Sequence, residues 1–381
     1  MKKKYKLKIN GESPRSLLLA NVLAKLNCEV YIYDFLRNHD SKKDYQIFLF
    51  SNTSKNLLTK FEIWNEIEDI SYGFTSLSIK DDLISEQLLL RTENFSKKYL
   101  DILGWTTNYS DIKKLLINKL IDYDNVHFIS KNQLKDKSLI FDYELTFHSY
   151  FKNLYFFELP LLNFKKIDEQ IFIFNVYLRG HIKKRLYEIN TSKGSLMLIP
   201  LDNNLYQIIW NNSPFRIKDS SLISKSFFLD NLTTLLPNEL KVDQIVGQIN
   251  SLPFNNIYSK FSIKNNKIYF FDYKSKSNII HDFNFDMLIR NTIQIYNFLE
   301  RNEPRKIEIA NKFGFYYLLR KYEEININFS LPNYLFNLFR LNNILSIFIR
   351  KFLFALFKRI NLIKKFFMSN LIISNINNLI K

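Results

Sequence analysis

A strand, a glycine turn, a helix and a second strand follow one another at the start of the chain. Residues 4–10 alternate in a strand-like pattern, and residues 17–26 place apolar side chains at helical spacing. Pro14 stands in the first helical turn, where its missing N–H costs nothing. Residues 29–34 form a short apolar run typical of a buried strand. This order predicts a βαβ unit, and hence a parallel sheet covered by helices.

The turn in this unit has few glycines available to it. The 381 residues include only 7 glycines, where average usage would give roughly 27. Gly11 occupies the first position of a phosphate-binding turn, while Ser13 and Ser16 occupy the second and third glycine positions. Asp34 follows Gly11 by 23 positions (34 − 11), close to the spacing of a carboxylate that accepts from a ribose hydroxyl. These residues indicate either a nucleotide site or a plain turn followed by a solvated strand end.

The rest of the pattern predicts further strands and helices. After the βαβ unit we expect a strand that passes into a helix at 46–64 and a helix at 109–120. A strand at 139–141 that ends at Asp142 would then return the chain to the first sheet. Antiparallel strands are expected at 70–80 and 87–90, in a strand-rich region at 154–210, and in a hairpin that turns at Asp202-Asn203-Asn204. Another strand is expected at 267–271, ending at Asp272, and from Phe285 onward the pattern is helical.

The C-terminal segment carries the charge asymmetry of the chain. The formal net charge is +17, from 54 Lys and Arg against 37 Asp and Glu, and no acidic residue follows Glu324. The excess indicates an anionic partner or an AT-rich genome. The bases after Glu324 lie among Leu, Ile and Phe, and no uncharged apolar run reaches the roughly 18 residues of a spanning helix. We therefore expect amphipathic helices that pack on the body of the protein or lie at a membrane surface.

Several other kinds of chemistry are not expected. The chain has 1 cysteine, Cys28, which excludes an internal disulfide, and its 5 histidines show no metal-binding spacing. No Gly-x-Ser-x-Gly elbow and no nucleic-acid motif is present. The basic N-terminus lacks the apolar region of a signal peptide. We expect a cytoplasmic protein, peripheral on the inner membrane surface if its tail docks there, with no metal site and no nucleic-acid partner.

Over nearly its whole length the chain resembles the ubiquinone-biosynthesis hydroxylases, a branch of the FAD-dependent aromatic-ring monooxygenases. The segment from Gly11 to Asp34 is similar to the FAD-binding opening of that family, and residues 48–64 resemble its serine-bearing strand, helix and closing Trp. The most specific match is residues 194–210, which resemble the substrate-sheet hairpin with its glycine, its Pro-Leu and its closing Trp210. Residues 268–291 fall on the second flavin motif, with Asp272 on the acid that meets the ribityl chain.

The flavin motifs depart from the family pattern at their glycines. Phe271-Asp272-Tyr273 stands where the family has Gly-Asp-Ala, and Asp282-Phe283-Asn284 replaces the loop on which the isoalloxazine rests. The middle Asp-Gly motif appears as Asp142-Tyr143. At these motifs the acid is kept and its glycine is lost, and a Cβ at such sites fills volume that cofactor atoms occupy. The resemblance therefore implies impaired or lost flavin binding.

The resemblance implies an α/β fold in which two domains are intergrown. An FAD-binding Rossmann-like domain, with a parallel sheet and a βαβ opening, would comprise residues 1–150 and 255–325 and contribute an excursion near 45–90. An antiparallel β-sheet substrate domain would comprise 151–254, and basic amphipathic C-terminal helices would comprise 326–381.

The resemblance also implies a chemistry and the residues for it. An active enzyme would take FAD and NAD(P)H and hydroxylate a polyprenyl-phenol or other apolar aromatic ring. Trp210 would line the substrate pocket, no catalytic side chain is identified, and FAD would be bound by Gly11, Ser13, Ser16, Asp34, Asp142 and Asp272. The alternative is a cofactor-free pseudo-enzyme that binds a quinone precursor or scaffolds partner hydroxylases. A complex with other quinone-biosynthesis proteins is compatible with both the active enzyme and the pseudo-enzyme.

Overall fold

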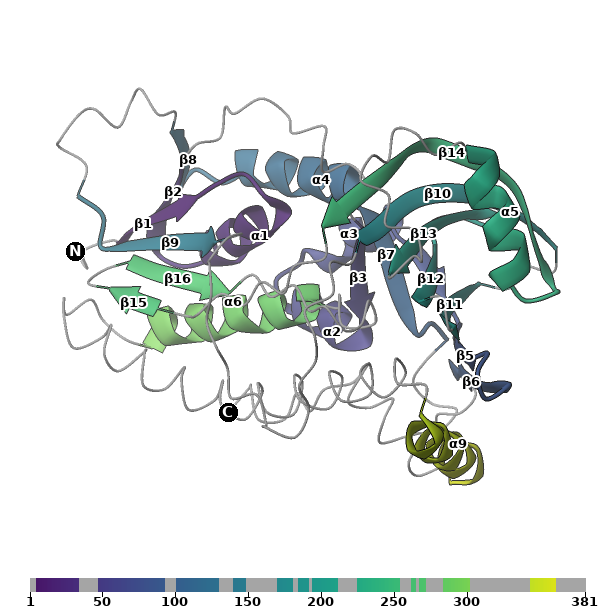
Figure 1. Cartoon of the computed structure of the whole chain (residues 1–381). Coiled ribbons are helices and arrows are strands. Elements are labelled where there is room, and N and C mark those ends of the chain that lie inside the picture. The colour runs from purple at the N-terminus through teal and green to yellow at the C-terminus, as the bar shows by residue number, and fades with distance from the viewer. Residues whose placement is uncertain are drawn as a thin grey trace.

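Three sheets organise the part of the chain that the computed structural model describes. These residues are 5–33, 47–92, 101–129, 140–148, 170–180, 184–191, 194–211, 225–253, 262–264, 267–271, 284–301 and 343–360. Within them a six-stranded sheet occupies one half of the molecule and a seven-stranded sheet the other, with a three-stranded sheet between them (Figure 1). The predicted α/β class, with a parallel sheet beside an antiparallel one, is confirmed.

The first sheet has the parallel order expected for a βαβ opening. Its strands run in the order β15 (Ser262–Lys264), β16 (Lys267–Phe271), β9 (Tyr143–His148), β1 (Tyr5–Asn10), β2 (Cys28–Tyr33) and β8 (Val126–Ile129). All neighbours are parallel except the edge pair β15 and β16. The chain leaves β1 toward β2 and later returns on the other side of β1 as β9. This is a topological switch point, where such sheets bind ligands beyond the carboxyl ends of their strands.

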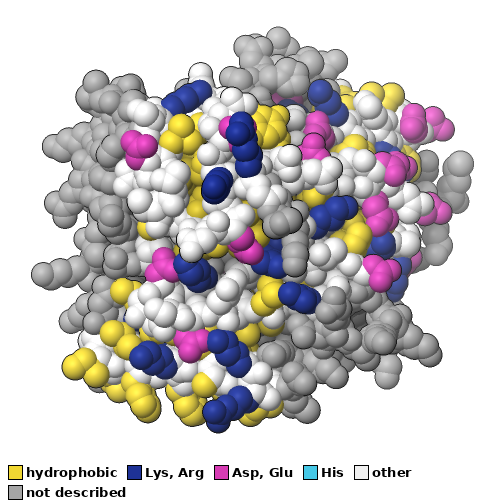
Figure 2. Space-filling model, turned by 90° about the vertical axis from the view of Figure 1, so that its right-hand side faces the viewer, with side chains coloured by type: hydrophobic (Ala, Val, Ile, Leu, Met, Phe, Trp, Pro, Cys, Tyr) yellow, Lys and Arg dark blue, Asp and Glu magenta, His cyan; other side chains and the backbone are white. Residues whose placement is uncertain are grey.

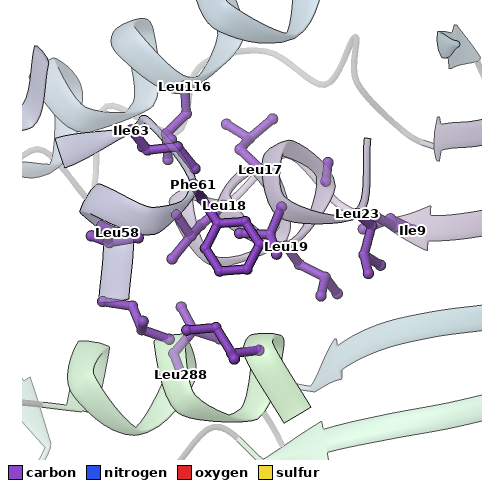
Figure 3. Close-up of a cluster of buried hydrophobic side chains, with 14 of the residues drawn as sticks. Ile9, Leu17, Leu18, Leu19, Leu23, Leu58, Phe61, Ile63, Leu116 and Leu288 are labelled. Atoms are coloured by element: carbon purple, nitrogen blue, oxygen red, sulfur yellow. The ribbon is translucent and has the colours of Figure 1, made fainter. Parts of the chain in front are cut away.

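Helix α1 (Pro14–Leu23) is the central helix of this half and is apolar around nearly its whole circumference, as a fully buried helix must be. Figure 3 shows its leucines pointing toward Phe61, Ile63, Leu116 and Leu288. Helices α4 (Tyr109–Ile121) and α6 (Asn284–Arg301) pack on it. The Asn21 amide donates to the Leu17 carbonyl at 2.9 Å and to the Leu116 carbonyl at 3.0 Å, which ties α1 to α4.

One strand of this sheet differs from its prediction. Residues 140–142 form no strand, and β9 begins at Tyr143. Tyr143 and Leu145 are buried with a partly exposed residue between them, the alternation of a strand with one face in the core. Asp142 precedes the strand, where its Oδ2 accepts from the Lys6 N–H and its own N–H donates to the Lys6 carbonyl, both at 2.9 Å. The apolar residues before Asp142 predict a strand, but strand pairing begins only at Tyr143, after Asp142.

The second sheet is antiparallel except for one pair of strands. Its order is β14 (Leu240–Pro253), β10 (Gln170–Gly180), β13 (Leu205–Asn211), β12 (Gly194–Pro200), β11 (Arg185–Thr191), β5 (Ser76–Asp81) and β6 (Glu86–Arg91). The predicted hairpin is confirmed as β12 and β13, while β11 and β5 pair in parallel. Since β5 and β6 come from the early excursion, this sheet is built from two distant parts of the chain.

A three-stranded sheet joins the two halves. It consists of β3 (Ile47–Ser51), β7 (Gly104–Asn108) and β4 (Tyr72–Phe74), and helices α2 (Asn52–Lys60) and α3 (Trp64–Asp69) follow β3. Phe48 and Phe50 of β3 pack into the core around α1, whereas Leu49 packs into a second core against the seven-stranded sheet. Alternate side chains of one strand therefore bind the two halves together.

The seven-stranded sheet has two differently covered faces. On its outer face, Trp210, Ile208 and Leu198 pack against α5 (Lys225–Leu235). On its inner face, Ile209 and Met197 lie in one core with side chains of the three-stranded sheet.

Helix α9 (Ile344–Arg359) docks on β5 and β6 through a buried ion pair. Arg350 Nη1 lies 3.0 Å from Asp81 Oδ2, and both side chains are completely buried. Phe354 joins the core of the inner face, and Lys358 pairs with Glu86. Among the described residues, no helix is long and apolar enough to cross a membrane.

Candidate functional site

The turn after β1 places a glycine with left-handed backbone directly before a helix. Gly11 has φ +93°, in the left-handed region that favours glycine, and its N–H donates to the Tyr33 carbonyl at 3.0 Å. A Cβ at this position would meet only the Ser16 hydroxyl, at 3.7 Å, so conformation rather than space requires glycine here. The turn leads into the N-terminus of α1, where backbone N–H groups and the helix dipole favour an anion.

Ser13 and Ser16 lie at this N-terminus, as predicted, but their hydroxyls are already bound to the protein. Ser13 is the N-cap residue of α1, and its Oγ accepts from the Ser16 N–H at 3.3 Å. The Ser16 hydroxyl donates to the Asn10 carbonyl at 3.1 Å. A phosphate at this turn would compete with the Ser13 hydroxyl for the Ser16 N–H.

An ion pair adjoins the turn. Lys113 Nζ on α4 lies 2.9 Å from Glu12 Oε1, and the two side chains are 10% and 21% exposed. The Glu12 carboxylate repels an anion at the turn, and the Lys113 ammonium, which would attract one, is engaged with it. The described residues thus fit the pyrophosphate of FAD in backbone geometry, with weaker attraction than a turn that lacks the carboxylate.

Not all of the predicted FAD-binding acids can be placed beside this turn. Strand register pairs Asn10 with Thr146, so Asp142 lies at the amino end of β9, roughly 15 Å of strand from Gly11. The structure therefore separates Asp142 from the turn and gives it a role in pairing with Lys6. The residue of β9 that reaches the turn end is Thr146, whose hydroxyl accepts from Asn10 Nδ2 at 2.6 Å. Asp34 and Asp272 lie outside the described residues.

Trp210, predicted to line the substrate pocket, lies on the outer face of the seven-stranded sheet. Its ring is 1% exposed and packs edge-on against Phe228 of α5, with a centroid distance of 6.1 Å. The neighbours of Trp210 in β13, Ile209 and Asn211, point the other way because side chains alternate along a strand. The structure thus turns Trp210 away from the six-stranded sheet.

A buried polar cluster that the sequence did not reveal lies on the inner face. It consists of Glu188 and Asn190 on β11 and Asn211 on β13, which are 7%, 5% and 3% exposed. In each residue one polar atom, Glu188 Oε2, Asn190 Nδ2 and Asn211 Oδ1, makes no hydrogen bond within the protein. A buried polar atom left without a partner costs about 1–3 kcal/mol, so such atoms are rare unless they bind water or a ligand.

Burial also changes the acidity of Glu188. Loss of hydration raises the pKa of its carboxyl group from 4.5 to about 7, and the neighbouring Asn190 side chain lowers it by a smaller amount. The group therefore gains or loses its proton near neutral pH. In the sequence, the cluster shows only as polar residues among apolar ones in these strands. That they share the inner face follows only from the register of the strands.

Metal chemistry has no support in the described part of the chain. No group of His, Cys, Asp and Glu there is arranged to hold a metal ion. His127 Nε2 lies 3.6 Å from Glu29 Oε2, and its ring lies tilted against that of Tyr31 with a centroid distance of 4.7 Å.

The chain is similar in structure to several oxygenases, one of which is described as a probable FAD-dependent monooxygenase. The p-nitrophenol 4-monooxygenase of Pseudomonas putida matches with a TM-score of 0.67 and 12% identity, over 97% of this chain and 98% of that chain. A probable FAD-dependent monooxygenase of Pseudomonas aeruginosa matches with a TM-score of 0.59 and 9% identity, over 82% of this chain and 91% of that chain. The tetrameric form of 2-methyl-3-hydroxypyridine-5-carboxylic acid oxygenase matches with a TM-score of 0.55 and 10% identity, over 82% of this chain and 86% of that chain.

No protein-family model and no curated protein matches the sequence. Because the three structures share between 9% and 12% identity with the chain, the likeness shows the fold. The likeness to the p-nitrophenol 4-monooxygenase spans nearly the whole chain.

Proposed function

We propose that this chain is an FAD-dependent monooxygenase-like protein with weakened flavin binding, which acts on a polyprenyl-phenol or other apolar aromatic ring. The observation that carries the proposal is the Gly11 turn, which lies at the switch point of a parallel sheet within a monooxygenase fold. The sequence resembles the hydroxylases of ubiquinone biosynthesis, and NAD(P)H would be the reductant.

The residues of the turn would hold the pyrophosphate of FAD. Gly11 supplies the left-handed backbone conformation of the turn, and the first turn of α1 offers N–H groups to the pyrophosphate. Bound FAD would supply the oxygen-activating chemistry. The protein would contribute apolar, water-poor surroundings, because the inner face of the seven-stranded sheet carries buried apolar side chains such as Met197 and Ile209.

Flavin binding should be weak for physical reasons visible at the turn. The Ser13 hydroxyl already satisfies the Ser16 N–H, and the Glu12 carboxylate adds negative charge where the phosphates would lie. Asp272, the acid expected to meet the ribityl chain, is flanked in the sequence by Phe271 and Tyr273 in place of small residues.

A second candidate is a cofactor-free pseudo-enzyme that binds a quinone precursor or scaffolds partner hydroxylases. The same contacts of Ser13 and Glu12 favour it, because they let the turn be stable without a phosphate. A protein that binds its ligand without transforming it would need the same fold and the same inner face of the seven-stranded sheet.

Titration of the purified protein with FAD, followed by the visible spectrum, tests the proposal. We expect a shifted flavin spectrum that saturates at micromolar rather than nanomolar FAD. Glu12→Gln should tighten binding because it removes the carboxylate at the turn. Glu62→Gln is the matched control, since Glu62 pairs with Lys25 on the surface. If neither the wild-type protein nor Glu12→Gln changes the flavin spectrum, the proposal fails and the pseudo-enzyme is favoured.

A membrane surface is the partner that we propose for α9, since a polyprenyl substrate resides in a membrane. The solvent side of this helix exposes large apolar side chains, Ile344 by 88%, Leu345 by 67%, Phe348 by 68% and Phe352 by 58%. Lys351 and Arg359 are exposed beside them. Figure 2 shows hydrophobic side chains interspersed with Lys and Arg at the bottom of its face, the level at which α9 lies in Figure 1. Apolar side chains flanked by bases suit an anionic bilayer.

A further inference from the structure

We infer that Glu188 and Asn190 bind the hydroxyl group of a phenolic ligand and that Asn211 binds a second polar substituent on the same ring. This inference rests on the proposed function, because it names the side chains with which the inner face would hold an aromatic ring. Sequence reasoning identified no side chain for this role.

Strand register brings these residues onto one face. Glu188 and Asn190 are two residues apart on β11, so both side chains point inward. Asn190 lies opposite Ser195 of β12, which in turn lies opposite Asn211 of β13. With strands about 4.8 Å apart, Asn190 and Asn211 are separated by roughly 10 Å, a span that an aromatic ring with two polar substituents can bridge.

The unsatisfied atoms match a phenol in hydrogen-bonding character. Asn190 Nδ2, Glu188 Oε2 and Asn211 Oδ1 make no hydrogen bond of ordinary geometry, although the Asn190 amide faces the Glu188 carboxyl group closely enough to offset part of the rise in its pKa. A phenol hydroxyl accepts one hydrogen bond and donates another, so it can accept from Asn190 and donate to Glu188. A methyl ether of the same ring cannot donate.

The surroundings of Glu188 suit an uncharged ring. Its neighbours in register are Ile79 on β5 and Met197 on β12, both apolar. The charged groups facing this region are Asp81 of β5 and Arg350 of α9, which form a completely buried pair with each other. The three-stranded sheet contributes apolar side chains such as Leu49 and Phe74 to this core, and the buried Thr106 hydroxyl, which donates to the Pro200 carbonyl of β12 at 2.5 Å. The ring would therefore meet apolar walls, with its polar groups directed at the cluster.

Calorimetric titration with para-propylphenol and with its methyl ether tests the inference without flavin. The wild-type protein should bind the phenol about tenfold more tightly than the ether, as expected for one hydrogen bond to a buried polar group. Glu188→Leu should abolish this preference. Tyr187→Phe is the matched control: Tyr187 is the adjacent residue, its side chain is also buried, and it points to the outer face. It should keep the preference.

A second readout separates a binding role from a merely structural one. In the wild-type protein the preference for the phenol should grow from about pH 6 to about pH 8, because an ionised Glu188 can only accept. Glu188→Gln should show no such change. Equal binding of phenol and ether by the wild-type protein, or an unchanged preference in Glu188→Leu, would overturn the inference. FAD binding is measured in a separate titration. A negative result with the phenol would therefore not contradict the proposed function, and a negative result with FAD would not contradict phenol binding by Glu188 and Asn190.

Discussion

Glu188→Gln is expected to change how the stability of the protein depends on pH. The pKa of Glu188 is raised from 4.5 to about 7 by burial, so in the unfolded chain the carboxyl group ionises at lower pH than in the folded protein. Between these two pH values the folded protein retains a proton that the unfolded chain has lost. The free energy of unfolding therefore falls as pH rises through this window and levels off above about pH 7.

The size of this effect follows from the pKa change. A rise from 4.5 to about 7 corresponds to about 3 kcal/mol, at about 1.4 kcal/mol for each tenfold change in the ionisation constant. Glutamine has a similar shape and does not ionise. Relative to the wild-type protein, Glu188→Gln should therefore gain about 3 kcal/mol of stability between about pH 4 and about pH 8.

Urea unfolding followed by tryptophan fluorescence at several pH values measures this gain. Taking the difference between variant and wild type at each pH removes the contribution of all other titrating groups. The exposed Glu62, whose pKa is lowered by its hydrogen bond to Lys25, provides a control in Glu62→Gln, because its contribution has the opposite sign. Parallel stability curves for wild type and Glu188→Gln would show that Glu188 is not a buried acid with a raised pKa and would refute the reasoning.

Three further predictions concern packing and the surface. Arg350→Met should destabilise the protein by about 3–5 kcal/mol because it leaves the Asp81 carboxylate buried without a partner, and Asp81→Leu in the same chain should restore most of the loss in denaturant unfolding. Gly104→Ala should cost about 1–3 kcal/mol in thermal unfolding, since its Cβ would lie 2.9 Å from the Phe50 carbonyl oxygen. Replacing Phe348 and Phe352 by serine should reduce flotation with anionic liposomes while Ile121→Ser, a similarly exposed site on α4, leaves it unchanged; equal flotation of all proteins would contradict membrane docking by α9.

Local patterns predicted much of the fold because they report local physics. The strand β16 was predicted with its observed bounds, and the hairpin of β12 and β13 followed from a polar turn between two apolar runs. The βαβ opening and its glycine turn were visible because Gly11 alone among nearby residues tolerates the left-handed backbone.

Features that depend on register or on distant pairing were not predictable in this way. The likeness of its hairpin predicts that Trp210 lines a substrate pocket, but it does not predict that the ring packs on Phe228 of α5, because a shift of one residue along a strand exchanges the faces. The pair of Asp81 and Arg350 joins residues 269 positions apart, beyond the reach of any spacing rule. For the same reason the cluster around Glu188 emerged only when β11, β12 and β13 were aligned.

The most direct measurement of the central claim is oxygen transfer to a phenol. The protein would be incubated with excess FAD, NAD(P)H, a para-alkylphenol and isotopically labelled dioxygen, and the products would be analysed by mass spectrometry. A monooxygenase-like protein with weakened flavin binding should yield a hydroxylated phenol with one labelled oxygen atom, at a rate that rises with FAD concentration through the micromolar range. The claim would be contradicted if the protein binds both the flavin and the phenol but the phenol is recovered intact and unlabelled at saturating FAD.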